Sequence, residues 1–271
     1  MSRVLITGGN GFVAKEINEY LKSDYEVHCL SKEKLNLLDK DSIKRRTLEF
    51  YDVIINTAVV GGNRKDVDDK SVFCDNMAMI ENLLSEMNDD QILINFSSGA
   101  EFRNENTAYG LAKKITTRII KGRKNSYNLR LYGCFGPDEM DTRFIKRCFD
   151  REEIIVADDI EFDFFYVQDV ARVCKFLIDG GLLHSYHPTN RRSDYNERIK
   201  DIDCVYEEKY KLSDIANMIK EKYRPDLQVI IGNPSGQEYV GDSRQLQNIN
   251  IFMKDKLAGL EKGLEAMNGK N

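Results

Sequence analysis

The most informative part of the sequence is V-L-I-T-G-G-N-G-F-V-A, residues 4–14. It begins as an apolar run typical of a buried strand, continues through glycines, and ends as the start of a helix. We expect Gly8 to make the tight turn after the strand and Gly11 to let the backbone approach a pyrophosphate. Ala14 stands where a third glycine often stands, which permits close packing of helix on strand. The N–H groups at the helix start would then bind the pyrophosphate.

Short apolar runs alternate with amphipathic helical patterns through the first half of this 271-residue chain. The pattern predicts strands at 4–7, 26–30, 53–57, 92–97 and 127–131, with helices at 12–22, 41–50, 71–88 and 108–122. Strands that alternate with helices indicate a parallel sheet covered on both faces, and right-handed crossovers make it doubly wound. The predicted fold class is therefore α/β, with a Rossmann-type doubly wound parallel sheet.

The alternation loosens after Gly136-Pro137. The later pattern predicts a basic helix over 142–151, then a short strand and the apolar segment 164–167, and a helix over 169–179. A polar excursion over 184–203, a helix over 214–223 capped by Ser213 and a last helix over 254–267 follow. We expect these elements to build a smaller C-terminal substrate-binding α/β region. The NAD(P)-binding domain would comprise residues 1–136 and about 164–206, and the substrate-binding region residues 137–163 and 207–271.

Composition and charge disfavour several classes of protein. The 40 Lys and Arg residues are outnumbered by 45 Asp and Glu residues, so a net charge of −5 offers no general basic surface to nucleic acid. The six cysteines form no CxxC pair and have no histidine at metal-ligand spacing, which predicts reduced thiols and no metal site. There is no signal-peptide pattern and no apolar run long enough to span a bilayer, so we expect a cytoplasmic protein without a membrane partner.

The second predicted strand ends in Cys29-Leu30-Ser31-Lys32. NAD-binding Rossmann folds usually place an acid at this tip, where it binds the 2′-hydroxyl of the adenosine ribose. No acid stands at the tip here, and Glu33 comes one step late. A hydroxyl at Ser31 beside the charge of Lys32 suits a 2′-phosphate better, although Lys32 could instead be a solvated surface residue. The sequence therefore predicts that NADP(H) is preferred and that NAD(H) is possible.

A serine, a tyrosine and a lysine form the candidate catalytic set. Ser98 follows a predicted strand, and open α/β sheets bind their ligands at strand carboxyl ends. Tyr109 and Lys113 lie four residues apart at the start of a helix, which puts them on one face. We expect the Lys113 ammonium to lower the pKa of the Tyr109 phenol. Ser98 would hydrogen-bond the reacting oxygen and hold it against Tyr109, the acid–base group.

The resemblance to a known family lies in six stretches of sequence. They are T-G-G-N-G-F-V-A (7–14), N-T-A (56–58), F-S-S-G-A (96–100), Y-G-L-A-K (109–113), L-R-L-Y-G-C-F-G-P (129–137) and F-D-F-F-Y-V-Q-D-V-A (162–171). In these stretches the chain resembles the extended short-chain dehydrogenases/reductases, nucleotide-sugar epimerase/dehydratase branch. K-L-N-L-L-D (34–39) and V-G-G-N (60–63) are most similar to the GDP-L-fucose synthases. That family reduces 4-keto-6-deoxy sugar nucleotides with NADPH, usually after epimerising positions 3 and 5.

The resemblance implies roles for the matching residues. Ser98, Tyr109 and Lys113 become the catalytic set, and Tyr109 and Lys113 also lie at the cofactor. Ser98 is implied to contact the substrate as well. The other implied cofactor contacts are Thr7, Gly8, Gly11, Phe12, Val13, Ser31, Lys32, Asn36, Leu37, Thr57, Ala58, Val59 and Asn76. A homodimer is expected on the same ground.

The chain also departs from the family pattern. Dehydratases follow their catalytic hydroxyl with Asp-Glu, where this chain has Gly99-Ala100, so we expect no dehydration. Fucose synthases epimerise with a Cys and a His, whose positions are Ala100 and Arg143 here, so we expect no epimerase activity. The arginine that often binds the substrate diphosphate is replaced by Phe162. Its expected substitutes are Arg143, Arg147 and Arg151, although these could also form a solvated basic face.

The leading functional hypothesis is NADPH-dependent reduction of a 4-keto, 6-deoxy nucleotide-linked sugar in surface polysaccharide synthesis, without epimerase activity. A nucleotide-sugar 4-epimerase or 4-oxidase with tightly bound NAD is the first alternative. A non-catalytic dinucleotide-binding protein is the second alternative, which the presence of both Tyr109 and Lys113 disfavours. The expected partners are the nucleotide-linked sugar and a second copy of the chain.

Overall fold

Six parallel strands form the main sheet of this computed structural model, which describes residues 2–62, 68–180, 200–232 and 236–269. The strands are β1 (Arg3–Thr7), β2 (Glu26–Leu30), β3 (Val53–Asn56), β4 (Ile92–Ser98), β5 (Ser126–Leu131) and β9 (Asp201–Cys204). Their order across the sheet is β2-β1-β3-β4-β5-β9, and every neighbouring pair is parallel. The chain adds β2 on one side of β1 and then adds β3, β4, β5 and β9 on the other side, so the order of strand addition reverses between β1 and β3. The predicted doubly wound fold class is confirmed.

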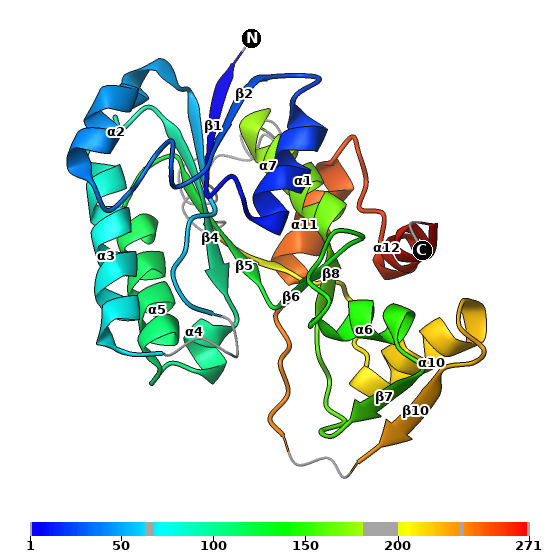
Figure 1. Cartoon of the computed structure of the whole chain (residues 1–271). Helices are drawn as coiled ribbons and strands as arrows, with labels where there is room; N and C mark the ends of the chain where they lie inside the picture. The colour runs from blue at the N-terminus through cyan, green and yellow to red at the C-terminus, as the bar shows by residue number, and fades with distance from the viewer. Residues whose placement is uncertain (1, 63–67, 181–199, 233–235, 270–271) are drawn as a thin grey trace.

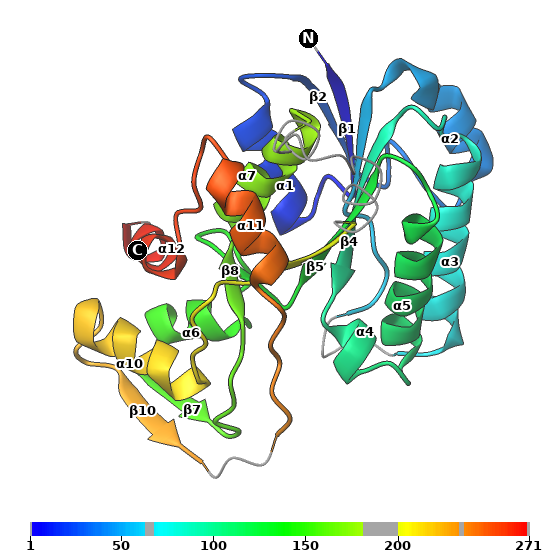
Figure 2. The ribbon, with the colours of Figure 1, turned by 180° about the vertical axis from the view of Figure 1, so that it is seen from behind.

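Helices cover both faces of this sheet (Figures 1 and 2). One face carries α1 (Phe12–Leu21), α7 (Val167–Ile178) and α11 (Arg244–Phe252), and the other carries α2 (Lys40–Arg46), α3 (Lys70–Ser85) and α5 (Ala108–Lys121). Alternate residues of β1 enter the two hydrophobic cores, Val4 and Ile6 on the α1 side and Leu5 on the α3 side. This alternation follows from the two-residue period of a strand, and it explains why β1 is apolar throughout.

A smaller unit lies beyond one end of the sheet, in the lower part of Figure 1. Its elements are β6 (Gly133–Phe135), α6 (Phe144–Asp150), β7 (Glu153–Val156), β8 (Phe164–Tyr166), α10 (Leu212–Lys222), β10 (Gln228–Ile231) and α12 (Leu260–Gly269). Four of these strands form two parallel pairs, β6 with β8 and β7 with β10. The carboxyl ends of the main strands point toward this unit (Figure 1), and open α/β sheets bind their ligands at those ends.

Several predicted elements differ in their bounds. The helix expected over 41–50 divides, because Thr47 adopts a left-handed φ of 54° before the 3₁₀ turn Leu48–Phe50. The short helix α4 (Ala100–Arg103) is absent from the prediction. The last helix begins at Leu260, not at residue 254.

Two more predictions concern the C-terminal half. Ser213 is not the expected N-cap, because α10 begins at Leu212 after the N-cap Lys211, and the Ser213 hydroxyl donates to Asp159. Most of the polar excursion expected over 184–203 lies outside the described residues, and residues 201–203 belong to β9. Among the described helices, none is long and apolar enough to cross a membrane. The described residues also contain no cluster of His, Cys, Asp and Glu arranged for a metal ion.

Candidate active site

The glycine loop after β1 forms a cradle that side chains would fill. Gly8 adopts a φ of +69°, and a Cβ there would lie 2.9 Å from the Thr57 hydroxyl oxygen. A Cβ on Gly9 would lie 2.8 Å from the carbonyl carbon of Leu30, to whose oxygen the Gly9 N–H donates a 2.8 Å hydrogen bond. Gly9 is thus a close-approach glycine that the sequence reading did not single out. Both positions require glycine for backbone reasons.

The helix that follows this loop is prepared for an anion. Gly11 is the N-cap of α1, so no side chain accepts from the first N–H groups at Phe12 and Val13, and no acid lies in the first turn. Free N–H groups and the helix dipole both favour a phosphate there. Thr57 donates to the carbonyl oxygen of Thr7 at 2.7 Å and ties the loop after β3 to the end of β1. The cradle therefore fits the pyrophosphate of a dinucleotide.

The loop after β2, where we predict that the adenosine ribose of the cofactor binds, carries the carboxylate of Glu33 beside Lys32. Lys32 is exposed, as a phosphate ligand needs to be, but Ser31 hydrogen-bonds Glu33. The Glu33 carboxylate also accepts from Asn10 of the glycine loop at 3.5 Å. These hydrogen bonds, led by that of Ser31, lower the pKa of Glu33, so its charge stands beside that of Lys32.

Hydrogen bonds between asparagine side chains and the backbone hold the other predicted cofactor residues in place. Asn36 binds Leu38 N–H through its side-chain oxygen at 3.1 Å, and the Leu37 carbonyl accepts from Asn82 on α3 at 2.9 Å. The Asn76 amide accepts from Val60 N–H at 3.2 Å and donates to the Val60 carbonyl at 2.8 Å. Asn76 therefore holds the loop that carries Ala58 and Val59 along the predicted cofactor path. Val59 is exposed on this loop.

The structure brings Ser98 and Tyr109 together. Ser98 ends β4 and Tyr109 is in the first turn of α5, and the two side chains lie close enough for the Ser98 hydroxyl to lower the pKa of Tyr109. Burial raises the pKa of Tyr109 to about 12, opposed in part by the Ser98 hydrogen bond and the charge of Arg143. This direction is opposite to the one expected from Lys113. The phenol stays protonated near neutral pH, which suits a proton donor.

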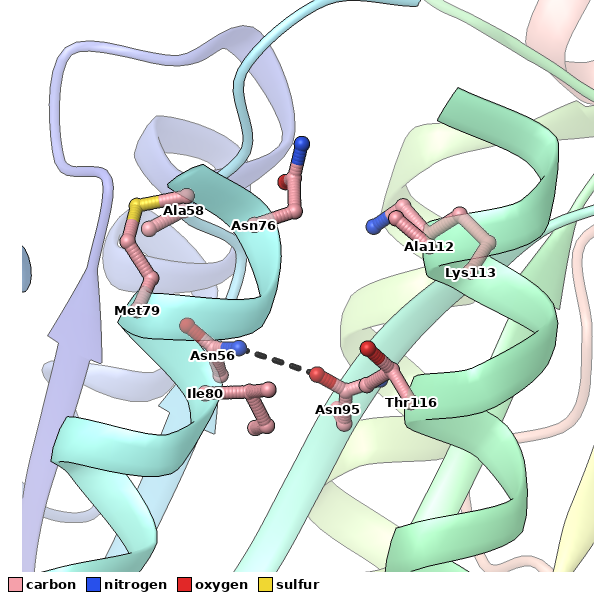
Figure 3. A pocket seen from close by; sticks show the side chains of 9 residues that line it. All are labelled: Asn56, Ala58, Asn76, Met79, Ile80, Asn95, Ala112, Lys113 and Thr116. Carbon is pink, nitrogen blue, oxygen red and sulfur yellow. Dashed lines mark hydrogen bonds between the residues drawn. The ribbon is translucent and has the colours of Figure 1, made fainter. Parts of the chain in front are cut away.

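Lys113 lies on the same face of α5 as Tyr109, with its ammonium nitrogen 5.7 Å from the centroid of the Tyr109 ring. The ammonium donates to the carbonyl oxygen of Phe96 at 2.8 Å. Burial is the main cause that lowers the pKa of Lys113 to about 8. Lys113 also borders a cavity of about 20 Å³, enough for one water, and Figure 3 shows it on α5 across from Asn76 on α3.

A row of polar side chains crosses the sheet beneath this cavity. Asn56, Asn95 and Asn128 are register partners on β3, β4 and β5, and successive amides are joined by 2.9 Å hydrogen bonds. Figure 3 shows the first of these bonds. Thr7 on β1 donates to Asn56 at 2.7 Å and extends the row toward the glycine loop. Because these buried groups are mutually satisfied, they connect the cofactor end of the sheet rigidly to the Lys113 side.

The predicted substrate arginines separate into near and far positions. Arg143 is the N-cap of α6 and lies close enough to lower the pKa values of both Tyr109 and Tyr239. Arg147 lies one turn along α6 and Arg151 at its C-cap, roughly 6 and 12 Å farther by helical rise. Arg143 is therefore the best placed of the three for a substrate bound at Ser98 and Tyr109.

Two further residues, Tyr239 and Arg103, lie at the site and were not predicted from the sequence. The Tyr239 hydroxyl lies 3.2 Å from the Ser98 hydroxyl, although the residues are 141 positions apart. Arg103 of α4 stacks over the Tyr239 ring with its guanidinium carbon 5.3 Å from the ring centroid. Within the described part of the chain, neither Arg103 nor Arg143 forms an ion pair. No local motif marks Tyr239 or Arg103, because only tertiary packing brings them to Ser98.

A family model described as the NAD dependent epimerase/dehydratase family matches residues 4–185. The chain belongs to this family. The resemblance to extended short-chain dehydrogenases/reductases is confirmed, and the chain is an NAD(P)-dependent oxidoreductase of that type. Sequence comparison with curated proteins finds no match.

Several solved structures share the fold over nearly the whole chain. GDP-mannoheptose C4 reductase from Campylobacter jejuni, with NADP bound, has a TM-score of 0.80 at 15% identity, over 99% of this chain and 98% of that one. GDP-L-fucose synthetase from Naegleria fowleri, bound to NADP, has a TM-score of 0.75 at 18% identity, over 99% of this chain and 92% of that one. L-threonine dehydrogenase from Phytophthora infestans has a TM-score of 0.79 at 15% identity, over 99% of this chain and 98% of that one. Since an amino-acid dehydrogenase matches as well as a sugar-nucleotide reductase, these likenesses show the fold alone.

One departure from the epimerase/dehydratase pattern has a steric reason. A Cβ on Gly99 would lie 2.4 Å from the Tyr132 ring and 2.9 Å from the Tyr239 ring. The acid that dehydratases carry at this position does not fit unless both rings move. Phe162, at the position of the family's diphosphate arginine, packs its ring on that of Tyr239 with centroids 5.0 Å apart. Tyr239 therefore fills space near both departures.

Proposed function

We propose that this chain reduces a 4-keto, 6-deoxy nucleotide-linked sugar with NADPH, as a step of surface polysaccharide synthesis. The observation that carries the proposal is the closeness of Ser98 and Tyr109 at the carboxyl end of β4, with Lys113 on the same helix face as Tyr109. The solved structures of GDP-sugar reductases with NADP support the same substrate class.

The side chains suit the acid–base part of a ketone reduction. Bound NADPH supplies a hydride, that is, a hydrogen with two electrons, to the carbonyl carbon. Ser98 hydrogen-bonds the carbonyl oxygen and holds it against Tyr109. Tyr109 gives its proton to that oxygen, and the resulting phenolate regains a proton from solvent. The positive charges of Lys113 and Arg143 stabilise this phenolate while it lasts.

The nucleotide end of the substrate is assigned to arginine. Arg143 and Arg103 approach Tyr239 from α6 and α4, and guanidinium groups bind diphosphate oxygens with paired hydrogen bonds. Arg147 and Arg151, farther along α6, have a smaller role.

The remaining assignments follow the family. We propose a cytoplasmic homodimer. The division into an NAD(P)-binding domain (1–136 and about 164–206) and a substrate-binding region (137–163 and 207–271) also stays a proposal. Its bounds need adjustment, because β6 and β8 pair with each other in the smaller unit and α11 covers a face of the main sheet. Light scattering of the purified chain tests the dimer.

The decisive experiment is mass spectrometry of any ligand that co-purifies, followed by NADPH oxidation with a panel of 4-keto sugar nucleotides. We expect turnover of at least one member, lost by at least 10²-fold in Tyr109→Phe with cofactor binding retained. Stoichiometric retained NAD and interconversion of two sugar epimers would instead establish the 4-epimerase. Unchanged turnover in Tyr109→Phe would refute the catalytic assignment.

A further inference from the structure

The backbone of Tyr239 is tied on both sides. Its N–H donates to the Glu161 carbonyl at 2.9 Å, and its carbonyl accepts from Asp163 N–H at 3.0 Å. Two residues on, Gly241 N–H donates to the Asp163 carboxylate at 2.7 Å, and that buried carboxylate also binds Lys209 at 2.8 Å. The segment that delivers Tyr239 is therefore anchored to the strand region beside the active site.

The Tyr239 ring is equally confined. It packs edge-on against the Tyr132 ring, with ring centroids 5.1 Å apart. It also packs at a tilt against the Phe162 ring, with ring centroids 5.0 Å apart. Arg103 covers another side, and Gly99 approaches so closely that a Cβ would lie 2.9 Å from the ring. With these neighbours the ring has one direction in which to present its hydroxyl, and the Ser98 hydroxyl lies there at 3.2 Å.

A count of hydrogen bonds around Ser98 assigns their directions. A serine hydroxyl donates one hydrogen and accepts at most two hydrogen bonds. Ala100 N–H already donates to Ser98 at 3.2 Å. If Ser98 gives its hydrogen to the Tyr109 side, where the carbonyl oxygen binds, its remaining acceptor position faces Tyr239. Burial raises the pKa of Tyr239, so this phenol is protonated at neutral pH and able to donate.

We propose that Tyr239 is a positioning residue, which donates its hydroxyl hydrogen to Ser98 and so directs the Ser98 hydrogen toward the reacting carbonyl oxygen. The inference rests on the proposed ketone reduction. Hydrogen bonds in a chain polarise one another, so a Ser98 that accepts from Ala100 and Tyr239 is also a stronger donor to the carbonyl oxygen. Tyr239 thus acts through Ser98.

The kinetic test removes only the hydroxyl, because Tyr239→Phe keeps the packed ring. We expect kcat for the ketone to fall about 10-fold, as for the loss of one hydrogen bond, with KM and NADPH affinity unchanged. Tyr132→Phe is the matched control, since that hydroxyl binds Asp203 at 3.0 Å and not Ser98. It should retain the wild-type kcat. Equal kcat losses in the two variants, or none in Tyr239→Phe, would overturn the proposal.

A double-mutant cycle separates action through Ser98 from independent action. In a Ser98→Ala background, Tyr239→Phe should cause no further loss of kcat. A full additional 10-fold loss would mean that Tyr239 acts on its own, contrary to the inference.

A readout without catalysis separates this inference from the proposed function. If no 4-keto sugar nucleotide is turned over, the proposed function fails, and high-resolution crystal structures of the wild type and Tyr239→Phe still decide the role of Tyr239. The Ser98 side chain should hold one rotamer in the wild type and populate a second one in Tyr239→Phe. A single unchanged Ser98 rotamer in the variant would overturn the positioning role.

Discussion

The ammonium of Lys113 on α5 donates a 2.8 Å hydrogen bond to the carbonyl oxygen of Phe96 inside β4. This bond fixes α5, which carries Tyr109, to the strand that carries Ser98. It also holds the ammonium where burial lowers its pKa to about 8. The charge that would stabilise the Tyr109 phenolate is therefore lost just above physiological pH.

The pH dependence of the reaction follows from this pKa. We expect kcat/KM to fall as pH rises through about 8, approaching tenfold per pH unit, because the Lys113 charge disappears. Tyr109, with its pKa raised to about 12, stays protonated in this range. Lys113→Arg, which keeps its charge, should remove this alkaline limb from the pH profile, whatever its absolute rate.

Unfolding does not account for such a decline. The pKa of Lys113 is lower in the folded chain than its ordinary value of 10.5, so between about pH 8 and 10.5 the unfolded chain binds more protons. This group therefore makes folding more favourable as pH rises through that window. Circular dichroism should show a folded protein at pH 9, and an alkaline limb that persists in Lys113→Arg would contradict the assignment.

Cofactor preference tests the tip of β2. Lys32→Glu should weaken NADPH binding far more than NADH binding, because a carboxylate would face the 2′-phosphate. Lys34→Glu is the matched control, an exposed lysine two residues on, and Glu33→Gln should favour NADPH by removing a nearby negative charge. Fluorescence titration with both cofactors provides the measurement. Wild-type affinity as high for NADH as for NADPH would favour the retained-NAD alternative.

The arginines test the diphosphate assignment. Arg103→Ala and Arg143→Ala should each raise the KM for a nucleotide sugar by roughly 10-fold or more, because a charge-assisted hydrogen bond is lost, while NADPH affinity stays unchanged. Arg151→Ala, at the far end of α6, should raise it little. Steady-state kinetics with each variant decides. Equal effects at Arg143 and Arg151 would show that the substrate does not bind where we place it.

Isotope exchange tests the expected lack of epimerisation. A base must remove a carbon-bound proton and an acid must return one, yet the family positions hold Ala100, which cannot ionise, and Arg143, which stays charged. Burial raises the pKa of Cys134 far above its usual range, so that thiol does not supply the base. A 4-keto-6-deoxy sugar nucleotide incubated with enzyme in deuterated water, without reduced cofactor, should take up no deuterium at positions 3 or 5. A fucose synthase serves as the positive control, and enzyme-dependent uptake here would refute the prediction.

The Rossmann-type sheet and the glycine cradle were predictable from the sequence alone, as was the placement of Tyr109 and Lys113 on one helix face. These features depend on short-range patterns: a buried parallel strand is apolar throughout, a φ of +69° at Gly8 needs glycine, and a spacing of four puts Tyr109 and Lys113 on one helix face. The helix bounds after residue 136 were harder to predict. There the apolar pattern is weaker, and contacts such as that of Ser213 with Asp159 set where α10 begins.

The directions of the pKa shifts and the partners of Ser98 depend on tertiary contacts, which no local sequence pattern reveals. Burial, which no local pattern reveals, raises the pKa of Tyr109 although a lysine lies on the same helix face. Tyr239 reaches Ser98 because its segment is hydrogen-bonded to Glu161 and Asp163, far away in the sequence. Likewise, Gly99 is small because two distant tyrosine rings occupy the space where its side chain would be. Such contacts between distant segments depend on how the smaller unit packs against the strand ends, and one sequence holds no periodicity that encodes that packing.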